Sequence, residues 1–212
     1  MRDIPCFTTG HGVAALSLRE IPVRGEAYIH LLQSQQPLAL LEECVSFCRA
    51  CGAVRVFAAE HDSLLGRPGY STVLRMQGTI APGETACLWP VTAENVGHWR
   101  QLYNEKMAPV DHATTLTAAD EARILSDGGA YFVHRQDTLL GIGWISGGTL
   151  LALAALQPGA GAVVLRTLAD LYPGQALELE VASTNRRALR LYERMGLIPT
   201  REVKKWYCVY GG

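Results

Sequence analysis

The sequence predicts an α/β fold in which a mixed central sheet is flanked by helices, and its clearest stretch runs from Leu150 to Leu197. Leu150–Leu156 is an apolar run of strand length, followed by a glycine loop and by apolar residues at helical spacing over Ala162–Leu171. Ala176–Ala182 alternates apolar and acidic residues with the period of a strand, and a second helical pattern then ends at Gly196. Strand, helix and strand in this order are typical of an α/β sheet.

The composition excludes several classes of protein. The chain has 212 residues, of which 49% are hydrophobic and 18% charged, as in ordinary globular proteins. A formal net charge of -1 gives no reason to expect a nucleic-acid partner. No apolar run approaches the roughly 20 residues that cross a bilayer, and the first residues lack the apolar stretch of a signal peptide. We therefore expect a cytoplasmic location and no membrane partner.

Residues 1–78 are predicted to form a smaller first unit. Its strands are expected at 13–18, 27–32, 54–59 and 71–76, and its helix at 38–51. The order strand, helix, strand, short turn, Gly69-Tyr70 and strand repeats that of residues 150–210. Where the later copy has a glycine loop, the first has Gln33-Ser34-Gln35-Gln36-Pro37, which cannot easily curl around a phosphate. We therefore interpret it as a degenerate copy with a structural role.

A linker rich in glycine and proline, residues 78–83, precedes a second unit that covers residues 84–212. Thr92 and the capping-box pattern Thr117-x-x-Asp120 predict the starts of two helices, the first reaching Met107 and the second ending near Gly128. A hairpin is expected over 130–134 and 139–145, and a last strand over 204–210. Ser183 or Thr184 is expected to cap the helix that ends at Gly196.

The loop Gln157-Pro158-Gly159-Ala160-Gly161 indicates an anion site, since backbone N–H groups at a helix start favour phosphate. A Walker loop is excluded because no Gly-Lys-Ser/Thr follows. A dinucleotide fingerprint fits better, because Glu180 stands where a ribose-binding acid is expected. However, Val164 occupies the third position, which needs glycine or alanine.

The motif Asn185-x-x-Ala188-x-x-Leu191-Tyr192-Glu193-x-x-Gly196-Leu197 resembles that of the GNAT superfamily of acyl-CoA-dependent N-acetyltransferases. The resemblance covers about residues 84 to 210 and includes the glycine loop, where that family binds pyrophosphate. It implies a GNAT fold, acetyl-CoA as cosubstrate and a primary amine as acceptor. The family loop usually begins with glutamine or arginine and is longer, whereas this one begins at Leu156. The cofactor-binding residues that the resemblance implies are Leu156, Gln157, Gly159, Ala160, Gly161, Ala162 and Asn185.

Two residues are candidates for the chemistry, and both are implied by the resemblance. Tyr192 matches the tyrosine that donates a proton toward the cofactor sulfur in many members of the family, and its alternative role is that of a core aromatic. Glu180 matches a glutamate assigned as general base in related ribosomal-protein acetyltransferases, and its alternative is a surface residue of the strand. Glu178 shares that face of the strand and is the substitute candidate. Asn185 would hold the pantetheine or serve only as a helix cap.

Other polar groups could serve acceptor recognition. Asp111 and His112 lie in the loop between the first two helices, and Lys204-Lys205-Trp206-Tyr207 lies in the last strand. An exposed basic face of the motif helix would attract phosphates or an acidic acceptor, although solvated side chains are the simpler interpretation. Its members are Arg186, Arg187, Arg190 and Arg194.

Cys44, Cys48 and Cys51 have the C-x3-C-x2-C spacing that radical-SAM enzymes use for an iron–sulfur cluster. Helical periodicity from Pro37, ended by Gly52, instead favours cysteines packed on one helix face, so no metal is predicted. The function predicted is transfer of acetyl from acetyl-CoA to a primary amine by direct attack in a ternary complex. A non-catalytic acyl-CoA-binding or protein-interaction module is the alternative, an oxidoreductase is third, and a homodimer is left open.

Overall fold

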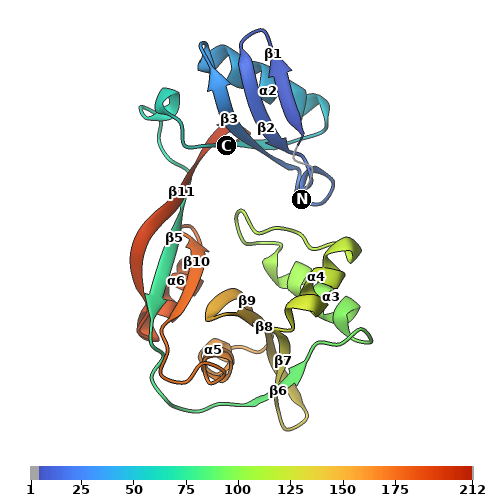
Figure 1. The fold of residues 1–212 in the computed structure, drawn as a ribbon, viewed down its shortest axis with the longest axis vertical. Helices are drawn as coiled ribbons and strands as arrows, with labels where there is room; N and C mark the ends of the chain where they lie inside the picture. The colour runs from blue at the N-terminus through green and yellow to red at the C-terminus, as the bar shows by residue number, and fades with distance from the viewer. Residues whose placement is uncertain (1–4, 212) are drawn as a thin grey trace. The chain divides into compact units, whose positions relative to one another are not determined.

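The computed structural model describes residues 5–211, which form two compact units (Figure 1). Unit 1 comprises residues 1–72 and 203–212, and unit 2 comprises residues 73–202. The last strand, β11 (Ile198–Tyr210), contributes its first residues to unit 2 and its remainder to unit 1. The strand β5 (Ser71–Gly78) contributes most of its length to unit 2, although it follows unit 1 in the sequence.

Unit 1 is a sheet of strand order β1-β2-β3-β4-β11 with one long helix. The connection from β3 through helix α2 to β4 makes β3 and β4 parallel, and the other neighbours are antiparallel. Its elements are β1 (Cys6–Thr9), β2 (Gly12–Ser17), α1 (Ile21–Arg24), β3 (Glu26–Ser34), α2 (Pro37–Ala50), β4 (Arg55–Ala59) and the 3-10 turn η1 (Asp62–Leu64).

The core of unit 1 lies between the sheet and α2. Leu40, Leu41, Cys44 and Cys48 of α2 are buried in it together with residues of β2, β3 and β4. Burial raises the pKa of the Cys44 thiol to about 12 and that of Cys48 to about 11, so both remain protonated. Cys51, by contrast, caps the helix and is exposed. The prediction that the cysteines pack on one helix face is therefore confirmed for Cys44 and Cys48 and wrong for Cys51, which lies at the end of the helix.

Unit 2 has the strand order β5-β10-β9-β8-β7-β6. Only β9 and β10 are parallel, because α5 connects them, so the sheet is mixed as predicted. Its elements are β6 (Cys87–Pro90), α3 (Val96–Met107), α4 (Ala118–Asp127), β7 (Ala130–Arg135), β8 (Thr138–Ser146), β9 (Thr149–Ala155), α5 (Gly161–Ala169), β10 (Leu177–Ala182) and α6 (Arg186–Arg194).

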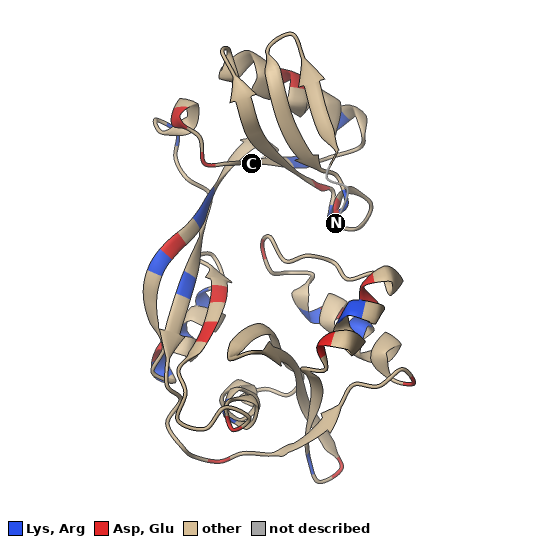
Figure 2. Ribbon diagram, viewed as in Figure 1, with Lys and Arg blue, Asp and Glu red and all other residues tan. Residues whose placement is uncertain are grey.

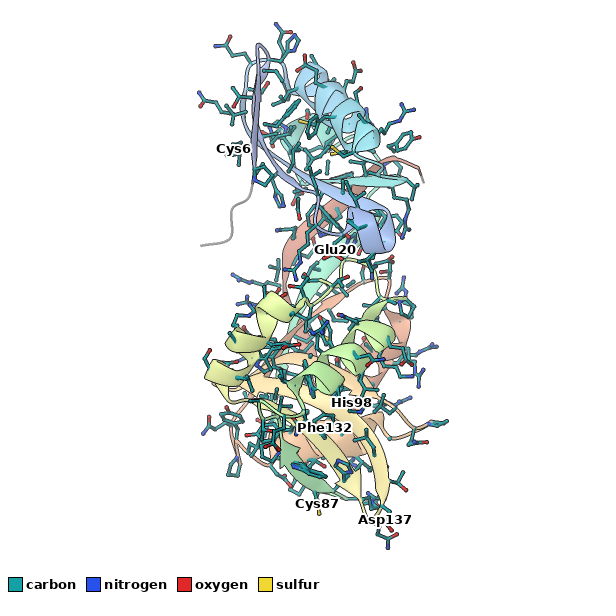
Figure 3. The ribbon with its side chains drawn as sticks, turned by 90° about the vertical axis from the view of Figure 1, so that its right-hand side faces the viewer. Cys6, Glu20, Cys87, His98, Phe132 and Asp137 are labelled. Carbon is teal, nitrogen blue, oxygen red and sulfur yellow. The ribbon has the colours of Figure 1, made fainter. Side chains whose placement is uncertain are left out.

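Each face of this sheet has its own core. One core joins α5 and α6 to Leu177, Leu179 and Val181 of β10. The other joins α3 and α4 to β7, β8 and β9 around the fully buried Trp99. On that second face, the rings of His98 and Phe132 stack with their centroids 5.9 Å apart (Figure 3). Residues of β10 that point away from α5 and α6 therefore belong to the face that carries α3 and α4.

Most predicted elements are present, with a few differences. The prediction that Thr92 caps the helix reaching Met107 is wrong, because α3 begins at Val96 with Asn95 at the cap position. The capping box of Thr117 and Asp120 is formed, and α4 ends at the left-handed Gly128. The prediction that Ser183 or Thr184 caps α6 is wrong: Asn185 is the cap, with its Oδ1 accepting from Ala188 N at 3.2 Å. Strand β1 was not expected, and β11 begins six residues earlier than the predicted 204.

Candidate active site

The parallel strands β9 and β10 separate after a short contact. Their register contains only two pairs, Thr149 with Glu178 and Leu150 with Leu179 (Figure 1). Beyond these two pairs, the backbone N–H and C=O groups of β9 and β10 form no ladder hydrogen bonds with each other. Backbone N–H and C=O groups in a sheet normally find partners, so this region can accept an extended ligand with amide groups of its own.

A β-bulge in β9 accounts for the separation. Ile145 of β8 pairs with Leu150, and the preceding Trp144 pairs with Ala152, so Leu151 is an extra residue in the ladder. Such an insertion bends the strand and increases its local twist. The bulge lies directly after the last pair with β10, and the Leu151 side chain is 50% exposed. Nothing in the uniformly apolar Leu150–Leu156 sequence indicates it.

The start of α5 presents backbone N–H groups beside this separation. The N–H groups of Gly161, Ala162 and Val163 have no hydrogen-bond partner among the described residues, and no side chain caps the helix. Gly159 has a φ of +79°, a left-handed conformation that suits glycine, and there is open space where a side chain would lie. Three unsatisfied donors at the positive end of a helix dipole are suited to a phosphate.

The other predicted loop residues use their amides within the protein. Leu156 N and Gln157 N both donate to Leu140 O, at 2.8 and 3.3 Å, and Ala160 N donates to Gln157 O at 3.2 Å. These bonds hold the loop in shape but leave those three N–H groups unavailable to an anion. The available N–H donors are therefore those of the first helical residues and not those of the loop. They include Val163, which the glycine pattern did not indicate.

Helix α6 packs its Leu191 against the glycine loop. A Cβ placed on Gly161 would come within 3.0 Å of Leu191 Cδ2, so a larger residue here would require the Leu191 side chain to shift. Asn185 caps α6 through its side-chain oxygen. The structure therefore supports the capping role of Asn185 directly, and its side-chain amide remains a candidate for holding the pantetheine.

Tyr192 is buried on the core side of α6. Its side chain is 8% exposed and packs in the same core as Ala160 of the glycine loop and Leu150 of β9. Over residues 5–211 no hydrogen bond of its hydroxyl is found, and the hydroxyl oxygen is not one of the fully buried polar atoms that lack a partner. Burial raises the pKa of Tyr192 to about 12, so the phenol is protonated and can donate at neutral pH.

Glu178 and Glu180 lie on the opposite face of β10, and an arginine joins them. Arg75 of β5 is the direct register partner of Glu180. Its Nη2 lies 2.8 Å from Glu180 Oε1, and its Nη1 lies 3.2 Å from Glu178 Oε1. Hydrogen bonding to Glu180 raises the pKa of Arg75. Arg75 belongs to the first half of the sequence, and nothing in its local context marked it as a site residue.

The remaining candidates are placed as follows. The four arginines of α6 are exposed and form no ion pair within the described part of the chain. His112 lies between α3 and α4 with a left-handed φ of +61°. Lys204 lies over the Trp206 ring at 5.1 Å, in the portion of β11 that belongs to unit 1. Over residues 5–211, no group of three or more His, Cys, Asp or Glu side chains could hold a metal ion, and no helix is long and apolar enough to span a membrane.

Comparison of the fold with known structures decides its class. No family model and no curated protein sequence matches the chain. A GCN5-related N-acetyltransferase from Sphaerobacter thermophilus superposes with a TM-score of 0.51 at 15% identity, covering 94% of this chain and 77% of that one. This chain has the GNAT fold. The predicted fold is thereby confirmed.

Two further structures with the GNAT fold cover nearly the whole chain. An acetyltransferase of the GNAT family from Colwellia psychrerythraea has a TM-score of 0.51 at 14% identity and covers 95% of this chain and 83% of that one. A tandem GNAT protein from the clavulanic acid biosynthesis pathway has the same score and identity, with coverages of 95% and 81%. At these identities the likeness concerns the fold, and the chemistry has to be argued from the residues.

Proposed function

We propose that this protein transfers an acyl group, acetyl in the first instance, from acyl-coenzyme A to a primary amine. The observation that carries the proposal is the unsatisfied start of α5 beside the separated strands β9 and β10. A donor with a pyrophosphate and an amide-containing arm matches both features at once, since the helix start suits the phosphates and the separated strands suit the amides.

The residues that would hold the donor are those with available groups. Gly161, Ala162 and Val163 would donate backbone hydrogen bonds to the pyrophosphate, and Gly159 leaves room for its approach. Leu156, Gln157 and Ala160 would support the loop through their internal bonds. Asn185 would orient the pantetheine arm through its side-chain amide.

Transfer forms a C–N bond and breaks the C–S bond of the thioester, while the amine loses a proton and the sulfur gains one. Coenzyme A supplies the activated thioester. Tyr192 would give a proton toward the leaving sulfur, because its phenol is neutral at physiological pH. Glu180 would accept the amine's proton through water from the opposite face of β10.

Residues 1–78 are proposed to be a degenerate GNAT-like unit that does not bind the donor. Pro37 begins α2 and has no N–H group at the position where Gly161 begins α5. The two parallel strands that flank α2 are paired over four consecutive positions, from Glu26 with Arg55 to Ile29 with Ala58. A helix start without one of its donors, next to strands that stay paired, lacks both features of the proposed site.

Calorimetry with acetyl-CoA, followed by measurement of CoA release in the presence of alkylamines, lysine and peptides with a free N-terminus, tests this proposal. Saturable binding with amine-dependent release of CoA is expected. Binding without release for any amine would favour the alternative, a non-catalytic acyl-CoA-binding module. No binding of acetyl-CoA at all would contradict both, and binding of NAD in its place would favour the dinucleotide interpretation of the glycine loop.

A further inference from the structure

Arg75 occupies a position on the sheet that the proposed chemistry does not yet use. It lies on β5, directly opposite Glu180 of β10, and side chains opposite each other in an antiparallel pair share one face. Glu178 is two residues from Glu180 on the same strand and therefore lies on that face as well. In Figure 2 these acidic positions on β10 lie beside a basic position on β5.

One guanidinium joins the two carboxylates. Its two terminal nitrogens each contact one carboxylate oxygen, at 2.8 Å for Glu180 and 3.2 Å for Glu178. The planar fork of arginine allows this, whereas the single ammonium of lysine could not hold both carboxylates in the same directions. The second oxygen of each carboxylate has no hydrogen-bond partner among the described residues. Glu180 is thus held by one oxygen while the other remains available.

The position of Glu178 and Glu180 along β10 places them next to the point where β9 and β10 separate. Leu179 makes the last pair with β9, so Glu180 is the first residue beyond the point where the strands separate. Glu178 and Glu180 lie on the face opposite α5 and α6, where Leu177, Leu179 and Val181 pack. The carboxylates therefore flank the separated strands from the side away from the start of α5.

Without a cation between them, two carboxylates on one strand face would repel each other. Arg75 opposes this repulsion, and its hydrogen bond to Glu180 raises the pKa of the guanidinium. The three groups are all partly exposed, at 27%, 33% and 45% for Arg75, Glu178 and Glu180, so the ion pairs contribute little to stability.

We propose that Arg75 is a positioning residue for amine deprotonation: it holds one oxygen of Glu180 and one of Glu178, which orients the Glu180 carboxylate and offsets the repulsion between the two groups. This inference rests on the proposed function. It assigns a catalytic contribution to a strand that precedes the linker and belongs, in sequence, to the first half of the chain. It also makes Glu178 a partner that shares the cation with Glu180.

The test compares Arg75→Met, Arg75→Lys and Glu180→Gln in steady-state assays of CoA release, using the amine from the panel above that is most active. In Arg75→Met kcat should fall and the acidic limb of the pH profile of kcat/KM should move upward, because the carboxylate loses the cation that holds it. In Arg75→Lys that limb should stay near its original pH while kcat remains lowered, because charge is restored without the fork. Glu180→Gln should abolish the limb.

Arg201→Met is the matched control, since it removes an exposed cation from the neighbouring strand β11 that forms no ion pair in the described residues. It should leave the pH profile unchanged. Acetyl-CoA affinity, measured by calorimetry, should be unchanged in all four variants. An Arg75→Met enzyme with the original pH profile would overturn the role of Arg75 alone. A wild-type protein that binds acetyl-CoA without any turnover would overturn the proposed transfer, and this role with it.

Discussion

The segments β3–α2–β4 and β9–α5–β10 share one connectivity but differ in what their backbones offer a ligand. Each is a parallel strand–helix–strand unit with an antiparallel strand on one side, β11 beside β4 and β5 beside β10. Each first strand even has a bulge with an exposed leucine, Leu32 in β3 and Leu151 in β9. Neither the connectivity nor the bulge therefore distinguishes β9–α5–β10, which carries the candidate site, from β3–α2–β4, which does not.

Two local differences separate these segments. α5 begins with three unsatisfied N–H groups after a glycine loop, whereas α2 begins at Pro37. β9 and β10 keep two register pairs next to the bulge, whereas β3 and β4 keep four that end three residues before Leu32. α6, with Tyr192, has only the three-residue turn η1 as its counterpart. From this comparison we expect an anion site to need both available amides and separated strands.

The largest effect is expected from Tyr192, which has no counterpart in unit 1. Tyr192→Phe removes only the hydroxyl and keeps the buried ring, so the fold should survive. Loss of a proton donor at the transition state should lower kcat by about 10²–10⁴-fold with little change in the KM for acetyl-CoA. Steady-state kinetics measures both constants. A variant as active as the wild type would return Tyr192 to the role of a core aromatic.

Gly161→Val should weaken phosphate binding at the start of α5, so that this helix start resembles that of α2. Its branched side chain would collide with Leu191, which already lies 3.0 Å from the position of a Cβ. We expect acetyl-CoA affinity to fall by about tenfold or more, since one lost charge-assisted contact is worth about 1.5–3 kcal/mol. Calorimetry on protein whose fold has been checked by circular dichroism measures it, and Gly161→Ala should have a smaller effect. Unchanged affinity would contradict the anion site.

The two units should also respond differently to alkaline pH. The pKa of Cys44 is raised from 9.0 to about 12 by burial in unit 1, and that of Tyr192 from 10.0 to about 12 in unit 2. Above the unfolded values the unfolded chain binds fewer protons than the folded one, so stability falls as pH rises. Melting temperatures should decrease from about pH 9, and Cys44→Ala should make that decrease shallower without removing it, because Cys48 keeps its raised pKa. An identical pH dependence in this variant would argue against the buried thiol as the cause.

A smaller effect is expected from the arginines of α6, for which unit 1 offers no equivalent. At about 100° per residue, Arg187 and Arg194 lie about 40° and 60° from Leu191, the residue at the glycine loop, and Arg186 lies about 140° away. Replacing Arg187 and Arg194 with alanine should weaken acetyl-CoA binding about twofold to fivefold at low salt, as for exposed charge pairs. Arg186→Ala is the control and should have no measurable effect. Equal effects of both changes would indicate only a general charge contribution.

The smallest effect is expected in unit 1. Pro37→Ala gives α2 back a backbone N–H at its start and tests whether that donor alone makes a site. Because β3 and β4 remain paired over four positions, we expect no second acetyl-CoA molecule to bind. Calorimetric stoichiometry measures this. A stoichiometry that rises from one toward two would show that available amides suffice without separated strands.

Much of this architecture could be predicted from local patterns. Alternation in Ala176–Ala182 placed β10, the Thr117–Asp120 capping box placed α4, and helical spacing placed Cys44 and Cys48 in a core. These predictions succeed because periodicity and capping depend on neighbours within one or two turns. The N-terminal cap of α6 was predicted one or two residues too early, since Ser183, Thr184 and Asn185 are all chemically suited to cap a helix.

By itself, the sequence determined the secondary structure of the site: a glycine loop at the start of α5, an alternating strand, and Tyr192 on the buried face of α6. The tertiary structure alone decided which amides are available, because Leu156, Gln157 and Ala160 use theirs on Leu140 and within the loop. It also decided where β9 leaves β10, because a bulge is a property of pairing with β8. Arg75 joins Glu180 across 105 residues of sequence, and only strand register brings such distant side chains together.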